Sequence, residues 1–189
     1  HGYEHFRATE QGVGKFLADI RLAKAVLEDI GGKPVHGYRA PSFSVGPGNP
    51  WAFDCIAEAG YRYSSSVYPI RHDHYGAPDS PRFAHEIRPG LLELPVATVR
   101  LMNANWPAGG GGYFRLLPYS ATRALMRSCN SAGRPVVFYL HPWEIDPDQP
   151  RIPAGLVTRF RHYRNLDKTE ARLRRLLRHP RRLRRPRRS

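Results

Sequence analysis

The feature that most constrains this chain is a recurring order of segments, in which a helical pattern precedes a short apolar stretch that ends on polar residues. Apolar residues recur every three or four positions over 9–30, which predicts one face of a helix. The extended stretch 35–38 then leads into Arg39, and the apolar stretch 135–140 ends at His141. Helices alternating with strands that end on reactive residues indicate an α/β layer or barrel with its site in the loops after the strands.

The remaining segments extend this pattern. Further helices are predicted at 51–59, 118–131 and 161–177, and further strands at 61–63 and 91–102, while the polar stretch 71–89 is expected to be a long loop. The first helix should cover the sheet next to the strand 135–140. One buried cluster is therefore predicted from both segments: Phe16, Leu17, Ile20, Leu27, Val136, Val137 and Phe138.

Charge divides the chain into a body and a tail. The net charge is +14, and ten of the arginines lie between positions 172 and 188. We expect one domain over 1–177 and a disordered Arg/Pro-rich tail over 178–189. The tail suggests an alternative function, binding of nucleic acid or an anionic membrane. Pro180 and Pro186 interrupt any helix there and no aromatic residue is present for base stacking, so no specific nucleic-acid recognition is expected. No apolar run is long enough to span a membrane.

The cysteines and several aromatic residues have an ordinary structural interpretation. Cys55 and Cys129 are far apart and without CxxC spacing, so we expect two buried thiols rather than a disulfide or a zinc site. Trp106, Tyr113 and Trp143 are either core residues or faces for sugar stacking. The loop histidines are expected to be solvated rather than ligands: His72, His74 and His85.

A pair of histidines opens the chain. His1 and His5 are four positions apart, which places two imidazoles on the same side of a helical turn or tight loop. This spacing alone is a loose pattern, because the alternative of two surface histidines is common. A metallopeptidase or amidase would use the same pair, but the chain lacks the HExxH motif that supplies ligands and base together.

The histidine pair, the Arg39-Ala40-Pro41 motif and the Leu140-His141-Pro142 motif occur in the order found in one enzyme family. In this respect the chain resembles the polysaccharide deacetylases that share the NodB homology domain, also called family-four carbohydrate esterases. Longer stretches are similar to the exopolysaccharide-associated branch found beside exosortase systems: 37–44, 65–73, 109–113 and 138–147. The resemblance covers residues 1–177.

The resemblance implies a distorted (β/α) barrel, incomplete here, that hydrolyses N-acetyl groups on a polysaccharide with a divalent metal, most often zinc. His1 and His5 would be metal ligands. Arg39 would orient a catalytic aspartate, and the backbone amide of Ser42 would stabilise the oxyanion. The family's paired aspartates would precede His1, so the chain as given is expected to be N-terminally incomplete and nearly inactive.

The same resemblance assigns the remaining site residues. His141 would be the general acid that protonates the leaving amine, with Glu144 as the candidate to orient it. Leu140 would line the acetate pocket, and the other predicted substrate-binding residues are Arg71, Asp73 and Trp143. The glycan, the oligomeric state and the choice between bacterial cytoplasm and cell envelope stay open.

Overall fold

The computed structural model describes residues 1–73, 75–131 and 133–178. Its main sheet consists of β1 (Gly37–Tyr38), β2 (Tyr63–Ser64), β3 (His85–Arg88) and β4 (Leu91–Glu93), in the order β1-β2-β4-β3. β1, β2 and β4 run parallel, whereas β3 is antiparallel to β4. The carboxyl ends of the three parallel strands therefore lie at one edge, as expected for a site built from the following loops.

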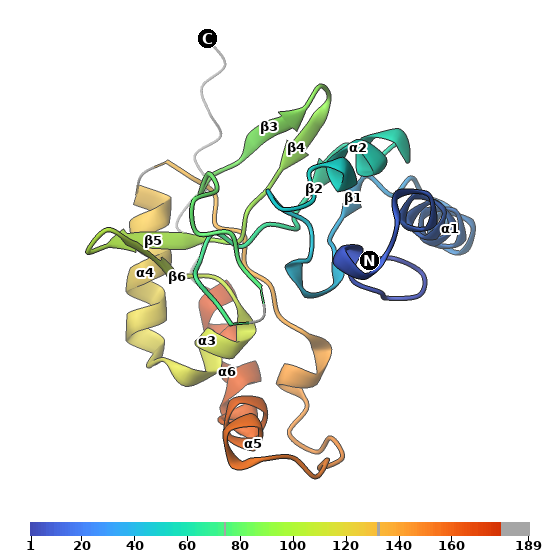
Figure 1. Cartoon of the computed structure of the whole chain (residues 1–189). Helices are drawn as coiled ribbons and strands as arrows, with labels where there is room; N and C mark the ends of the chain where they lie inside the picture. The colour runs from blue at the N-terminus through green and yellow to red at the C-terminus, as the bar shows by residue number, and fades with distance from the viewer. Residues whose placement is uncertain (74, 132, 179–189) are drawn as a thin grey trace.

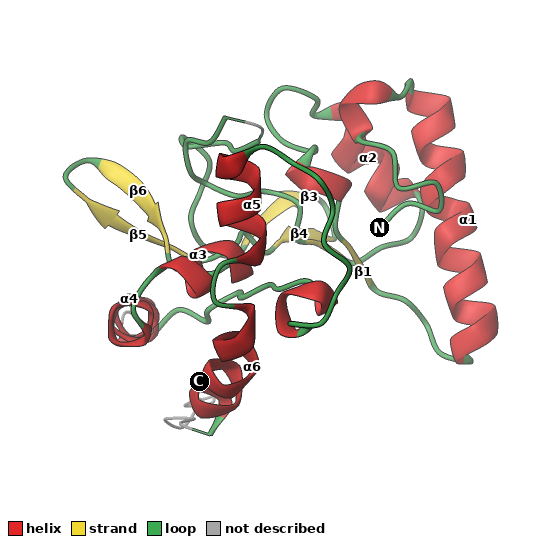
Figure 2. Ribbon diagram, turned by 90° about the horizontal axis from the view of Figure 1, so that it is seen from below, coloured by secondary structure: helices red, strands yellow, loops and turns green. Residues whose placement is uncertain are grey.

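Two helices cover one side of this sheet. The short 3-10 helix η1 (Ala8–Glu10) leads into α1 (Val13–Gly31), and α2 (Trp51–Glu58) connects β1 to β2. Figure 1 and Figure 2 both place α1 and α2 side by side, away from the other helices. Phe16 and Ile20 are fully buried among residues of α2, Tyr38 and Leu91. The helices predicted at 9–30 and 51–59 are thus confirmed.

The predicted buried cluster is wrong in its composition. Phe16 and Ile20 are buried and Leu17 is partly buried, but Leu27 is 52% exposed. Val136 packs elsewhere, against the residues around Cys129. The reason is that α1 packs against α2, whereas Leu27 and Ile30 near its C-terminal end are exposed.

A second layer contains β5 (Thr98–Leu101), β6 (Ala104–Pro107), α3 (Gly111–Leu116) and α4 (Tyr119–Ser131). The antiparallel hairpin β5–β6 packs against α4, as Figure 1 shows. Cys129 is buried between them and Cys55 is buried in the first core, both as free thiols as predicted. The predicted extended stretch 91–102 contains both β4 and β5, and the helix predicted at 118–131 is confirmed as α4.

The stretch 135–140 does not form the buried strand predicted for it. It lacks strand pairing within the described residues, and Val136 to Leu140 are only half-buried. Its backbone contact with the second layer is a hydrogen bond from the Ala97 amide to the Val137 carbonyl, at 3.0 Å. Apolar residues alone do not make a strand, because a strand requires a neighbour that pairs along its length.

The C-terminal segment forms two helices instead of one. α5 (Leu156–Tyr163) and α6 (Leu166–Leu177) are separated at Asn165, whose φ of 56° is left-handed. The loop predicted at 71–89 likewise contains β3 near its end. The short 3-10 helices η2 (Pro41–Phe43) and η3 (Pro142–Ile145) follow Arg39 and His141.

The described strands leave the sheet open and form no closed barrel, so the chain is mixed α/β and the deacetylase-type barrel stays a prediction. Within the described ranges, no helix is both long and apolar enough to cross a membrane. The predicted disordered tail lies outside the described residues, apart from Arg178.

Candidate functional site

Arg39 is held where the parallel strands end. It follows β1, and its Nε and Nη2 donate hydrogen bonds to the carbonyl and the Oγ of Ser65 at 2.9 and 2.8 Å. Ser65 follows β2, and its hydroxyl donates to the Leu94 carbonyl just after β4, at 2.7 Å. One guanidinium is thus fixed by the ends of three neighbouring strands.

A buried carboxylate supports these strand ends. Glu93 is fully buried, and its Oε1 accepts hydrogen bonds from the amides of Ser66 and Val67, both at 2.9 Å. Ser66 in turn accepts the amide of Ala40 through its Oγ at 2.9 Å. Burial raises the pKa of Glu93, although hydrogen bonds from Ser64 and these amides oppose the change. The network fixes the backbone on both sides of Arg39.

His1 and His5 lie together, as their spacing predicted. Their ring centroids are 5.0 Å apart, and Nδ1 of His1 is within hydrogen-bonding distance of the Arg39 carbonyl. Buried Asp19 of α1 accepts the Glu4 amide at 2.8 Å and so anchors the loop between the two histidines. A Cβ on Gly2 would lie 1.9 Å from Asp19 Oδ2, so only glycine fits there. Within the described ranges, no group of three side chains is arranged as a metal site.

The backbone after Arg39 is strained. Ser42 and Phe43 have φ values of 52° and 50°, a left-handed conformation that non-glycine residues rarely adopt. Such strain concentrates at functional sites. The Ser42 amide makes no hydrogen bond within the described part of the chain. Ser42 and Phe43 line a cavity of about 270 Å³ together with Tyr68 and Tyr75.

Tyr139 connects Arg39 to His141. The Arg39 guanidinium carbon is 5.8 Å from the centre of the Tyr139 ring, and the ring centroids of Tyr139 and His141 are also 5.8 Å apart. Phe43 packs edge-on to the same tyrosine at 5.0 Å. Through His1, Arg39 and Tyr139, direct contacts therefore lead from the histidine pair to His141.

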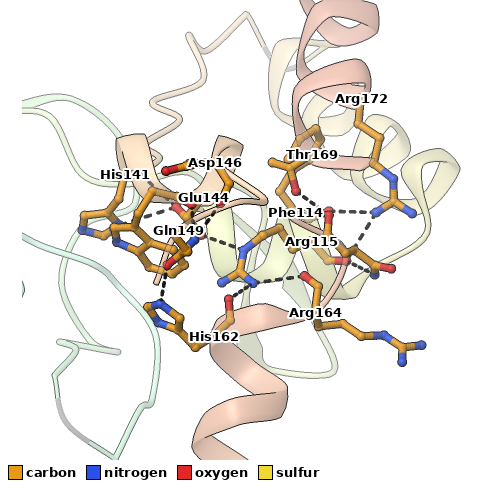
Figure 3. A network of polar contacts seen from close by, with 12 residues as sticks. Phe114, Arg115, His141, Glu144, Asp146, Gln149, His162, Arg164, Thr169 and Arg172 are labelled. Carbon is orange, nitrogen blue, oxygen red and sulfur yellow. Dashed lines mark hydrogen bonds and ion pairs between the residues drawn. The ribbon is translucent and has the colours of Figure 1, made fainter. Parts of the chain in front are cut away.

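His141 is supported by Glu144, as the sequence suggested. The His141 amide donates to Glu144 Oε2 at 2.8 Å, and the imidazole Nδ1 lies 3.5 Å from the same oxygen. Glu144 is buried, and its other oxygen accepts a hydrogen bond from Arg115 Nε at 3.0 Å (Figure 3). Burial raises the pKa of Glu144, but the hydrogen bonds from His141 and Arg115 lower it by more, so the net pKa is below its usual value.

The predicted substrate-binding residues lie apart from the cavity. Trp143 is stacked on His162, with ring centroids 4.1 Å apart, and the Arg115 guanidinium lies 5.0 Å from its centre. Asp73 pairs with His72 at 2.9 Å and with Arg161 at 3.6 Å. Arg71 is exposed and Leu140 is half-buried. None of these four candidates is among the described residues that line the cavity.

The loop histidines and exposed aromatics behave differently from one another. His72 is not solvated as expected, since its ring stacks on Tyr75 at 4.0 Å. His85 Nδ1 lies 2.9 Å from the Phe83 carbonyl, and His74 is outside the described residues. Trp106 is 53% exposed on β6, whereas Tyr113 packs against the buried Tyr68 cluster.

Sequence reasoning missed four residues that organise the site: Asp19, Ser65, Arg115 and Tyr139. The serine run after β2 and the tyrosine two positions before His141 were visible signals for two of them. Asp19 resembles any polar residue of an amphipathic helix. Arg115 is one of 26 arginines in the chain and has no distinguishing neighbour in the sequence.

Residues 65–184 match the model of one protein family, described as a domain of unknown function (DUF3473). The chain belongs to this family. No curated protein matches the chain. The DUF3473 region includes Ser65, Arg115, His141 and Glu144, whereas the histidine pair and Arg39 precede it. The candidate site is therefore assembled from the DUF3473 region and from the segment before it.

Several arginines of the basic run are engaged within the DUF3473 region. Arg172 donates to backbone carbonyls at the end of α3, and Arg174 pairs with Glu170 at 2.7 Å. Arg175 lies over the ring of Tyr119, 4.5 Å from its centre. These three arginines have structural partners, while positions 179–189 lie outside the described residues.

Proposed function

We propose that this chain carries the greater part of the active site of a metal-dependent hydrolase that removes N-acetyl groups from a polysaccharide, in exopolysaccharide or cell-envelope metabolism. The observation that carries the proposal is the meeting of three motifs that are far apart in sequence. His1 contacts Arg39, and Arg39 and His141 both contact Tyr139. The resemblance to polysaccharide deacetylases assigns His1, Arg39 and His141 to one reaction.

The histidine pair suits a divalent metal. A metal-bound histidine usually donates its second ring nitrogen to a carbonyl or carboxylate, and Nδ1 of His1 is placed in this way against the Arg39 carbonyl. Nε2 of His1 and a nitrogen of His5 would then be two ligands. The third ligand would come from outside the described residues. A metal bound there would lower the pKa of water and polarise the acetamide oxygen.

Arg39 and Ser42 suit the charge that develops in amide hydrolysis. Two nitrogens of the Arg39 guanidinium donate hydrogen bonds to Ser65. Nη1 makes no hydrogen bond within the described residues, so it is available to orient a catalytic aspartate. The Ser42 amide, held in its left-handed turn at the cavity, is available to donate to an oxyanion. Both groups are fixed before substrate arrives, which favours catalysis.

His141 suits the role of general acid. Its side chain is 53% exposed, so the imidazole is accessible to a leaving amine. Glu144 lies on the Nδ1 side and favours the tautomer with hydrogen on that nitrogen, which leaves Nε2 for proton transfer. Imidazole is the side chain whose ordinary pKa is best matched to this task near neutral pH.

The test is acetate release from polymers of N-acetylglucosamine and N-acetylgalactosamine by the protein expressed with its upstream sequence. We expect release that a chelator abolishes. His5→Ala should lower zinc content and rate together, and His141→Ala should lower turnover by roughly 10²–10⁴-fold with zinc retained. His36→Ala, at an exposed position before β1, is the matched control.

The resemblance places the third ligand and the base before His1, so we expect the 189-residue chain by itself to release almost no acetate, because two histidines alone hold a metal loosely. Release that resists the chelator and survives His141→Ala would contradict the mechanism. No release from either polymer by the extended protein would contradict the function.

A further inference from the structure

We propose that Arg115 is a positioning residue for His141, acting through Glu144, and that the C-terminal helices of the DUF3473 region serve to hold it in place. The inference rests on the proposed function and names a part of the site that the deacetylase resemblance does not assign. Arg115 is 2% exposed, although it carries a permanent charge. A buried guanidinium requires partners for its donors, and Figure 3 shows where they lie.

The partners of Arg115 come from three separate segments. Nε donates to Glu144 in η3, while Nη1 donates to the carbonyls of His162 and Arg164 at 2.8 and 3.1 Å. The two carbonyls belong to the end of α5 and the junction before α6. The guanidinium is planar and rigid, so these carbonyls determine the direction in which Nε points. The position of Glu144 therefore depends on the α5–α6 junction.

Helix α6 also holds the backbone of Arg115. Asn165 Nδ2 donates to the Arg115 carbonyl at 2.6 Å, and Arg172 Nη1 lies 3.3 Å from the same oxygen. These donors satisfy carbonyl groups that the end of α3 leaves unpaired. The left-handed backbone of Asn165, which separates α5 from α6, brings its amide group to this carbonyl. Both the side chain and the main chain of Arg115 are thus fixed by the C-terminal helices.

Glu144 transmits this order to His141. One carboxylate oxygen accepts a hydrogen bond from Arg115 Nε. The other accepts one from the His141 amide at 2.8 Å and lies 3.5 Å from Nδ1 of the imidazole. Without Arg115 the buried carboxylate would lose its charged partner and would move or take up a proton. Either change would release His141 from its orientation. Arg115 does not reach the cavity, so its effect on catalysis would be indirect.

The close approach of α3 supports a fixed geometry. An added Cβ on Gly111 would lie 1.9 Å from Glu144 Oε2, so the carboxylate is in contact with the α3 backbone as well as with Arg115. Trp143 packs against both the Arg115 guanidinium and the His162 ring, and the side chains of Arg115 and Glu144 are each only 2% exposed. The carboxylate therefore has little freedom to rotate.

The first experiment measures the network in the 189-residue chain and needs no enzymatic activity. Hydrogen exchange of the His141 amide is compared in the wild type, Arg115→Met, Arg115→Lys and Arg174→Met. We expect exchange at least about tenfold faster in both Arg115 variants, because lysine cannot reproduce the fork of donors. Exchange of the Gly32 and Ala59 amides in the first layer should be unchanged. Arg174→Met is the matched control, since Arg174 forms an exposed pair.

The second experiment measures acetate release from N-acetylglucosamine polymer by the extended protein. Arg115→Met and Glu144→Gln should each lower kcat by roughly 10–100-fold, with KM changed by less than about threefold, as expected for a supporting residue. The double variant should be no slower than either single variant, because both changes break one connection.

The outcomes separate this inference from the proposed function. Unchanged exchange of the His141 amide in both Arg115 variants would overturn the positioning role whatever the activity. Additive losses in the double variant, or an equal loss in Arg174→Met, would overturn it as well. Faster exchange together with no acetate release by the wild type would contradict the deacetylase proposal and leave the network intact. If Arg115→Met does not fold, the exchange and rate of Arg115→Lys decide.

Discussion

The environments of Arg39 and His141 differ in kind, although both side chains contact Tyr139. Arg39 lies above an apolar core built from α1, α2 and the sheet, and its hydrogen bonds go to a neutral serine. His141 depends on a buried ion pair, and the neighbouring Tyr139 packs against a smaller apolar cluster around Tyr68 and Val96. The first region is thus stabilised mainly by apolar burial, and the second by charges that are stable only as a pair.

The pKa values of the two buried glutamates, Glu93 and Glu144, shift in opposite directions for the same reason. The pKa of Glu93 is raised by burial, because its partners are neutral. The pKa of Glu144 is lowered, because hydrogen bonds from His141 and Arg115 outweigh burial. The pKa of Glu93 is therefore higher in the folded than in the unfolded protein. Its contribution to stability decreases as pH rises from the unfolded pKa through the folded pKa. The pKa of Glu144 is lower in the folded than in the unfolded protein. Glu144 therefore contributes stability at pH above its unfolded pKa, and this contribution is lost as pH falls through the folded pKa.

The largest effect is expected from breaking the ion pair. Arg115→Met should lower the free energy of unfolding by about 3–5 kcal/mol at neutral pH, because it leaves a buried carboxylate without its partner. The loss should shrink at acidic pH, as pH falls through the lowered pKa of Glu144 and the carboxylate takes up a proton. Urea denaturation at a series of pH values measures both. A loss that is the same at every pH would contradict the assignment of charge to this region.

Phe16→Ala tests the apolar region. The side chain is fully buried, so its truncation should lower the free energy of unfolding by about 3–4 kcal/mol. The loss should not depend on pH, in contrast to that of Arg115→Met. Leu27→Ala, on the exposed part of the same helix, is the matched control and should stay within about 0.5 kcal/mol. Equal losses in the two variants would show that α1 packs along its whole apolar face.

Gly111→Ala tests the close contact between the α3 backbone and the Glu144 carboxylate. The added methyl group would overlap the carboxylate, so the free energy of unfolding should fall by about 1–3 kcal/mol. Gly112→Ala is the control, because a Cβ there has no neighbour within 4 Å. Thermal melts of the two variants compare neighbouring glycines of the same run. A larger loss for Gly112→Ala would contradict the close contact between α3 and η3.

The smallest effect is expected at Glu93. Glu93→Gln removes a buried charge but keeps an oxygen for the Ser66 and Val67 amides, so stability at pH 7 should change by less than about 1 kcal/mol or increase. Below about pH 4 the wild type gains in comparison, because its own carboxyl is neutral. A loss of several kcal/mol at pH 7 would indicate that the ionised form of Glu93 is required.

The sequence by itself determined the elements whose pattern is local. Helices α1, α2 and α4, the strand before Arg39, the buried cysteines and the adjacent histidines all follow from periodicity, composition or short spacing. Glu144 was a candidate partner of His141 because it follows the histidine closely in the sequence, where the deacetylase resemblance leads one to expect an acidic residue. Such features depend on neighbours in the chain, which the sequence lists directly.

Only the tertiary structure decided the features that depend on distant neighbours. The apolar stretch 135–140 has no pairing partner among the described residues, so it is not a strand, and Leu27 is 52% exposed although it belongs to the apolar face of α1. Asn165 separates two helices where periodicity predicted one, and its side chain reaches Arg115. The role of Arg115 could be recognised only in the tertiary structure, where α3, η3 and α5 pack together around its side chain. The local sequence does not determine which charge is buried, because burial and pairing are set by packing between segments that are far apart in the chain.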